Sequence, residues 1–226
     1  MALESFIMAT VLNPHVVEKA QAQLDSVVGR DRLPTFEDKP RLPYIIAIMQ
    51  ETLRWRPVIQ GGMPHAVTED DSYKGYLIPK NSAIIANGWA LSHEESIFPI
   101  PEEFNPDRWI ENPSLPVSAW GFGKRICTGR FVAMNSLYIN IARILWTFDI
   151  EHAYEEKDGK MVKCEIDPMA MSQGLSSGPM PFKVVFKVRS KYTADVIRKE
   201  WDEAEKDVDV LLERIGKMQP GMGSKV

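Results

Sequence analysis

The stretch WGFGKRICTG, residues 120–129, places a single cysteine among three glycines, two large aromatic side chains and two cations. Glycine permits backbone conformations and close approaches that a Cβ would block, so Gly121 and Gly123 let the backbone come near a bulky ligand. Gly129 follows the cysteine where a helix is expected to begin, and the free N–H groups of a helix start stabilise a thiolate. Arg125 is well placed to bind an anionic group. The stretch therefore predicts a loop that presents one sulfur and one cation to a ligand.

Several roles for that sulfur remain open from the residues alone. A buried, inert cysteine would leave the glycines and the arginine unexplained. A zinc site needs about three more ligands, and no second Cys or His lies nearby in the sequence. A nucleophilic cysteine needs a histidine base, and the histidines fall in no recognisable catalytic motif: His15, His65, His93 and His152. The loop favours haem, a flat metal-containing cofactor that carries carboxylates, over these alternatives without eliminating them.

Composition and charge narrow the class of protein. The chain has 226 residues, 44% of them hydrophobic and 26% charged, and a formal net charge of −4. This length suits one large domain or two small ones, and this charge balance gives no nucleic-acid footprint. The two cysteines are too few for a disulfide framework, which favours a reducing compartment. No apolar run approaches the ~18 residues of a membrane span, and the acidic start lacks the basic region of a signal peptide.

Periodicity outside the cysteine loop predicts an α+β protein in which helices dominate. Apolar residues at helical spacing predict helices over residues 3–11, 14–28, 43–53 and 130–146. Alternating apolar residues predict a small β region over 71–88 and a half-buried strand over 182–188. Five prolines between residues 93 and 119 predict an extended segment without regular structure.

The last part of the chain has a different character. Apolar residues spaced 4-3-4-3-4 form an a/d seam among many charges: Ile197, Trp201, Ala204, Val208, Leu211 and Ile215. Two interpretations remain open, an amphipathic helix folded back on the domain and a self-associating coiled coil. Residues from Gly216 onward are expected to fray. We therefore divide the chain into a domain over residues 1–190 and a charged amphipathic helical tail over residues 191–226.

Three motifs in order resemble those of one known family. The loop at residues 120–129 resembles F/W-x-x-G-x-R-x-C-x-G, the cysteine-ligand signature of the cytochrome P-450 superfamily. Upstream, ETLR at residues 51–54 resembles the family's E-x-x-R, and PEEFNPDRW at residues 101–109 resembles its P-x-x-F-x-P-x-R meander. The segment at residues 63–80 is similar to fungal members. The resemblance covers residues 2–190 and implies the C-terminal half of the cytochrome P-450 fold.

The resemblance also implies roles for individual residues. Cys127 corresponds to the axial thiolate ligand of the iron of haem b, and Arg125 and His65 correspond to contacts of the haem propionates. Trp120 would shield the thiolate. The implied cofactor-binding residues are therefore Cys127, Arg125, His65, Trp120, Gly123 and Gly129. A second implied group is a buried ion network that locks the meander to its helix, made of Glu51, Arg54 and Arg108.

The implied activity is that of a haem-thiolate monooxygenase, which inserts one atom of O₂ into a small apolar organic substrate, as in fungal secondary metabolism. The implied electron donor is a flavoprotein NADPH reductase. Two interpretations of Lys124, Arg130 and Arg143 remain open, a basic face on which that partner docks and surface charges that only keep the protein in solution. Substrate-facing segments would lie at residues 58–62 and 172–177. The residues expected to line the substrate pocket are Ile59, Met171 and Leu175. A full-length member would lie on the cytoplasmic side of the endoplasmic reticulum.

The sequence departs from the family pattern in three places. Thr128 follows the cysteine where the family has an apolar residue or proline, and His93 stands where an aspartate is usual. The oxygen-activating motif A/G-G-x-D/E-T occurs nowhere in the chain, and Met1 falls where its helix should still be running. We therefore expect a truncated chain that lacks the membrane anchor and is cytoplasmic, with apolar surface exposed on the helices at 2–12 and 130–146. The alternative is a non-catalytic haem-binding or interaction remnant of such an enzyme.

Overall fold

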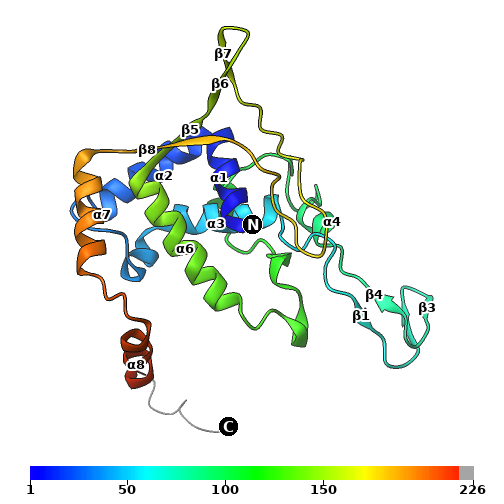
Figure 1. Ribbon diagram of the computed structural model, residues 1–226. Helices are drawn as coiled ribbons and strands as arrows, with labels where there is room; N and C mark the ends of the chain where they lie inside the picture. Colours follow the sequence, from blue (N-terminus) through cyan, green and yellow to red (C-terminus); the bar gives the residue numbers. More distant parts are fainter. Residues whose placement is uncertain (219–226) are drawn as a thin grey trace.

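The computed structural model describes residues 1–218 and has an α+β architecture in which helices dominate (Figure 1). The α-helices are α1 (Ala2–Leu12), α2 (Pro14–Val27), α3 (Pro43–Trp55), α4 (Gly88–Ser92), α5 (Asp107–Glu111), α6 (Arg130–Thr147), α7 (Lys191–Glu203) and α8 (Val208–Met218). Three 3₁₀ turns are η1 (Phe36–Arg41), η2 (Ser118–Trp120) and η3 (Gly123–Arg125). The fold class expected from the sequence is therefore confirmed.

The strands pair two by two, and every pair is antiparallel. The strands are β1 (His65–Ala66), β2 (Asp71–Tyr73), β3 (Tyr76–Ile78), β4 (Ala83–Ile84), β5 (Phe148–His152), β6 (Tyr154–Lys157), β7 (Lys160–Lys163) and β8 (Val184–Val188). The pairs are β1 with β4, β2 with β3, β5 with β8 and β6 with β7. Figure 1 shows β6 and β7 as a hairpin that projects from the body, and β1, β3 and β4 at another extremity.

Helices α1, α2, α3 and α6 form the core. Their apolar faces meet in one cluster that includes Phe6, Ile45, Ile48, Tyr138 and Trp146, each at most 1% exposed. In α6 the buried positions recur every three to four residues, as expected for a helix with one face in a core. The core therefore joins the first helix of the chain to the helix that follows the cysteine loop.

The expectation of exposed apolar surface on the two helices at 2–12 and 130–146 is wrong for the first helix. Phe6 and Ala9 of α1 are 0% exposed, because α1 packs against α3, α6 and β5. The expectation holds for the start of α6, where Phe131 and Val132 are 62% and 76% exposed. Of these two helices, only α6 exposes large apolar side chains to this extent, at its start next to the cysteine loop.

Several local predictions need correction. The segment between residues 93 and 119 was expected to have no regular structure but contains α5 and η2. The strand predicted over 182–188 exists as β8. Its apolar face was expected to be half-buried, but Phe186 packs edge-on against Phe148 of β5 and is still 43% exposed. The predicted burial of this strand is therefore only partly confirmed. Strands β5, β6 and β7 were not predicted at all.

The seam predicted to run as one helix from Ile197 to Ile215 is interrupted. Helix α7 ends at Glu203 and α8 begins at Val208. The carboxylate of Asp207 accepts the backbone N–H groups of Asp209 and Val210, a local bond that starts a new helix rather than continuing the old one. Of these two helices, it is α7 that contacts the core, through Val196 and Ile197.

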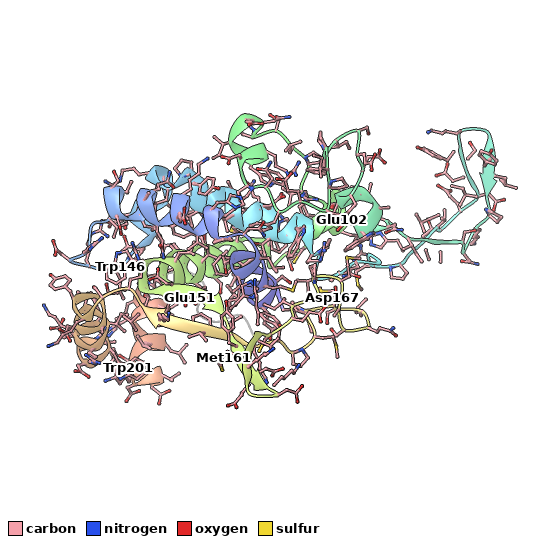
Figure 2. The ribbon with its side chains drawn as sticks, turned by 90° about the horizontal axis from the view of Figure 1, so that it is seen from above. Glu102, Trp146, Glu151, Met161, Asp167 and Trp201 are labelled. Atoms are coloured by element: carbon pink, nitrogen blue, oxygen red, sulfur yellow. The ribbon has the colours of Figure 1, made fainter. Side chains whose placement is uncertain are left out.

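Helix α8 leaves its apolar side chains in solvent, and Figure 2 shows Trp201 of α7 on the outside of the molecule. The division at residue 190 stays a prediction. Residues 219–226, on which most of the predicted fraying falls, lie outside the described residues. Within residues 1–218, no helix combines the length and the apolar character needed to cross a membrane.

Candidate functional site

The cysteine loop is a tight turn that two glycines make possible. The backbone N–H of Cys127 donates to the carbonyl of Trp120 at 2.8 Å, which closes the loop. Gly121 and Gly123 have φ angles of +74° and +57°, in the left-handed region that side chains with a Cβ rarely adopt. The residue types that the sequence analysis singled out are therefore required by the backbone of this turn.

The sulfur lies immediately before the start of α6. Gly129 is the N-cap residue of that helix, and its carbonyl accepts the N–H of Ala133 at 3.0 Å. Cys127 is exposed and Cys164 is buried, and both are free thiols. The first turn of α6 thus presents its free N–H groups close to an exposed sulfur.

A cavity of about 850 Å³ opens beside this loop. Cys127, Arg125 and Trp120 line it from the loop, and His65 of β1 lines it from a segment about 60 residues earlier. The remaining wall is mostly apolar and comes from the first two residues of the chain, the end of α3 and the segment after it, the region of β4, the cysteine loop and α6. The structure therefore brings to one cavity the thiol and the cation of the loop and a histidine that is distant in the sequence.

These residues fit a haem. The thiol supplies a soft ligand for iron, the arginine and the histidine supply donors for carboxylates, and the apolar wall suits a porphyrin. Among residues 1–218, Arg125 forms no salt bridge that would compete for its guanidinium. Gly123 has open space where a Cβ would stand. Gly129 would place a Cβ 3.9 Å from the sulfur of Cys127.

A second cluster is centred on Glu51 of α3, which is 0% exposed. Its carboxylate accepts two bonds from Arg54 at 2.8 Å each and one from Arg108 at 3.1 Å. The backbone N–H of Asn105 and the indole N–H of Trp109 add bonds of 2.9 Å each. The three residues expected to form an ion network therefore lie together, and two further donors join them at the carboxylate.

Arg54 extends this cluster to the backbone of the meander. Its guanidinium donates to the carbonyls of Ser92, Pro101 and Glu103 at 2.8–3.1 Å. The sequence analysis missed Asn105 and Trp109, although both stand inside the motif PEEFNPDRW. A tryptophan next to a conspicuous arginine was the available signal, since a buried indole N–H needs an acceptor.

One of the three residues expected to line a substrate pocket lies at the cavity, and two do not. Ile59 lines the cavity, whereas Met171 and Leu175 are not among its lining residues. Their segment still contacts that of Ile59, because the N–H of Ser177 donates to the carbonyl of Val58 at 2.7 Å. Two of the expected docking cations, Lys124 and Arg130, flank the cysteine. The third, Arg143, lies farther along α6 and donates a hydrogen bond to the carbonyl of Pro34.

Comparisons with known proteins agree with this geometry. The family model for cytochrome P-450 matches residues 1–186. The cytochrome P-450 monooxygenase FrzL of Cladobotryum sp is 50% identical over 216 residues, which is 96% of this chain and 41% of that protein. The monooxygenase aneD of Aspergillus aculeatus is 44% identical over 95% of this chain and 41% of its own length. The chain thus spans about two fifths of the curated relatives it matches.

Solved structures show the same relation. A zebra fish cytochrome P-450 with progesterone has a TM-score of 0.74 at 31% identity, over 82% of this chain and 42% of that one. The structure with abiraterone has a TM-score of 0.73 at 29% identity, over 83% and 43%. This chain belongs to the cytochrome P-450 family, and its fold corresponds to a part of that family's fold.

Proposed function

We propose that the chain forms the thiolate side of the haem site of a monooxygenase. The observation that carries this proposal is the single cavity lined by Cys127, Arg125 and His65. The three come from two segments about 60 residues apart, so their meeting is a property of the fold and not of one motif. Family membership supports a haem cofactor, and we assign haem b to this cavity.

When bound, the haem supplies the chemistry of oxygen activation, and the thiolate ligand favours cleavage of the O–O bond. The chain itself positions the cofactor. Cys127 binds the iron, Arg125 and His65 hold the carboxylates, and Trp120 covers the sulfur side of the cavity against water. Gly123 keeps its side of the loop open for the approach of the ring.

The substrate proposed is a small apolar organic molecule, because most of the cavity wall is apolar and includes Val58 and Ile59. The proposed electron donor is a flavoprotein reductase, which Lys124 and Arg130 would attract to the cysteine side through opposite charge. For the whole protein we propose the cytoplasmic face of the endoplasmic reticulum. The relatives' names support monooxygenation without specifying a substrate for this chain.

The test is the carbon monoxide difference spectrum of the chain after reconstitution with haem and reduction. We expect the strongly red-shifted Soret band of a thiolate-ligated haem, its loss in Cys127→Ala, and its retention in the matched variant Cys164→Ala. A band that survives Cys127→Ala would contradict the assignment. The absence of the band from a folded wild-type chain would also contradict it and would leave the non-catalytic alternative.

A further inference from the structure

The part of the cavity wall formed by residues 58–62 has no regular secondary structure, yet it is held at two points. The carbonyl of Val58 accepts the N–H of Ser177 at 2.7 Å. The carbonyl of Gln60 accepts the N–H of Trp89, in α4, at 2.8 Å. The position of this wall therefore depends on two other segments, the loop at 168–178 and helix α4.

One side chain contacts both of those segments. Arg56 is the C-cap residue of α3, and its side chain is 1% exposed. Its Nε donates to the carbonyl of Pro168 at 2.8 Å, at the start of the 168–178 loop. Its guanidinium also lies 4.1 Å from the ring centroid of Trp55 and 5.4 Å from that of Trp89. Arg56 thus touches the loop and the helix whose backbones hold the wall.

The remaining contacts of Arg56 fix its own position. Its Nη1 donates to the carbonyl of Trp55 at 2.7 Å, and Nη2 lies 3.3 Å from a carboxylate oxygen of Glu102. The negative charges of Glu102 and Asp167 both act on Arg56 and favour its charged form. Burial lowers the pKa of Arg56, and the side chain of Glu102 is 59% exposed.

A charge buried against a half-exposed partner is poor evidence for a stabilising role, because desolvation offsets much of the attraction. The hydrogen-bonding geometry of Arg56 gives a better reason than ion pairing for an arginine at this position. A planar guanidinium has several donors in a fixed arrangement, so it can fix separate backbone segments relative to each other. No apolar side chain of similar size would donate to Pro168 and to Trp55 at once.

We infer that Arg56 is a positioning residue that fixes residues 58–62 and so sets the width of the cavity on that side. It does so by joining α3, the 168–178 loop and α4 at the point where the chain leaves α3. The consequence for substrate size rests on the function proposed above. The mechanical part of the inference, namely that Arg56 fixes the position of residues 58–62, does not rest on that function.

Hydrogen exchange tests the mechanical part on the full 226-residue chain, with and without added haem. The variants are Arg56→Met, Arg56→Lys and, as a matched control, Arg143→Met, which removes another arginine that donates to a proline carbonyl. In Arg56→Met the amides of Ser177 and Trp89 should exchange at least ~10-fold faster, with Ile141 of α6 unchanged. Arg56→Lys keeps the charge and should give a smaller increase, and Arg143→Met none at these amides.

Two outcomes would overturn the inference. One is unchanged protection of Ser177 and Trp89 in both Arg56 variants. The other is an increase that is equal at these amides and at Ile141, since Arg56 would then stabilise the whole fold without acting on the wall. If Arg56→Met unfolds the chain, the inference is tested with Arg56→Lys alone, by comparing exchange at Ser177 and Trp89 with exchange at Ile141.

A second measurement tests the effect on size selection in the haem-loaded chain. Imidazole and 4-phenylimidazole are titrated against the Soret absorption. We expect Arg56→Lys to change the Kd of 4-phenylimidazole at least ~5-fold and that of imidazole less than ~2-fold, since only the larger ligand reaches the wall. Equal changes for both ligands would overturn the inference. Failure of the wild-type chain to bind haem would contradict the proposed function, while the exchange data would still judge Arg56.

Discussion

The cluster around Glu51 and the loop around Cys127 are both groups of charged and polar residues, but they differ in what satisfies them. Each carboxylate oxygen of Glu51 accepts bonds from protein donors on α3 and on the meander, and the residue is 0% exposed. The thiol of Cys127 and the guanidinium of Arg125 face a cavity of about 850 Å³. The carboxylate of the first group is satisfied within the chain, although Nη2 of Arg108 is buried without a hydrogen-bond partner among the described residues. The second group instead faces a cavity that a ligand could fill.

This difference separates residues that keep the fold from residues that define the function. Glu51, Arg54 and Arg108 join two segments of the chain, so a defect there should appear as lost stability. We propose that Cys127 and the glycines near it hold a cofactor, so a defect there should appear in the spectrum of the loaded protein. Substitutions in the two groups therefore test whether one group acts on stability and the other on cofactor binding.

The largest effect is expected for Glu51→Ala. Removal of this carboxylate leaves the guanidinium groups of Arg54 and Arg108 buried without their acid, which should destabilise the chain by about 3–5 kcal/mol. The measurement is urea unfolding followed by circular dichroism. Glu18→Ala, at an exposed position of α2, is the control and should change stability by less than ~0.5 kcal/mol. Similar losses for both variants would show that the cluster has no special role.

The cluster and the loop also differ in how well the sequence predicted them. The three ion-pair residues were predicted from the resemblance of the motifs at 51–54 and 101–109 to those of the family, and not from their spacing alone. Asn105 contributes through its backbone N–H, which no residue pattern encodes. His65 and Arg125 line the same cavity because of the tertiary structure, which a short motif cannot specify.

Secondary structure was predicted where periodicity was strong and missed where it was weak. The core helices α1, α2, α3 and α6 follow an apolar spacing of three to four residues. The β6–β7 hairpin is mostly polar and exposed, so its apolar pattern is faint. Asp158-Gly159 at its turn was the available signal, because both residues have positive φ angles and Asp-Gly is a preferred hairpin turn.

A smaller effect is expected for Gly123→Ala in the cysteine loop. Nothing lies within 4 Å of the added Cβ, so the cost is the left-handed backbone conformation alone, about 1–2 kcal/mol. Urea unfolding of the variant measures it. The matched control Gly61→Ala also has open space for a Cβ but no left-handed φ, and should cost clearly less. A loss above ~3 kcal/mol for Gly123→Ala would mean that the loop takes part in the core.

The smallest effect on stability is expected for Cys127→Ala measured without haem. The side chain is exposed, and the hydrogen bond that closes the loop comes from the backbone N–H, which alanine retains. The free energy of unfolding should therefore change by less than ~0.5 kcal/mol, while the same substitution abolishes the thiolate band of the haem-loaded chain. A loss of ~2 kcal/mol or more would show that the sulfur supports the fold in the manner of Glu51. In that case the two groups would not differ as the geometry indicates, and the spectral change alone would no longer separate loss of a ligand from loss of the loop.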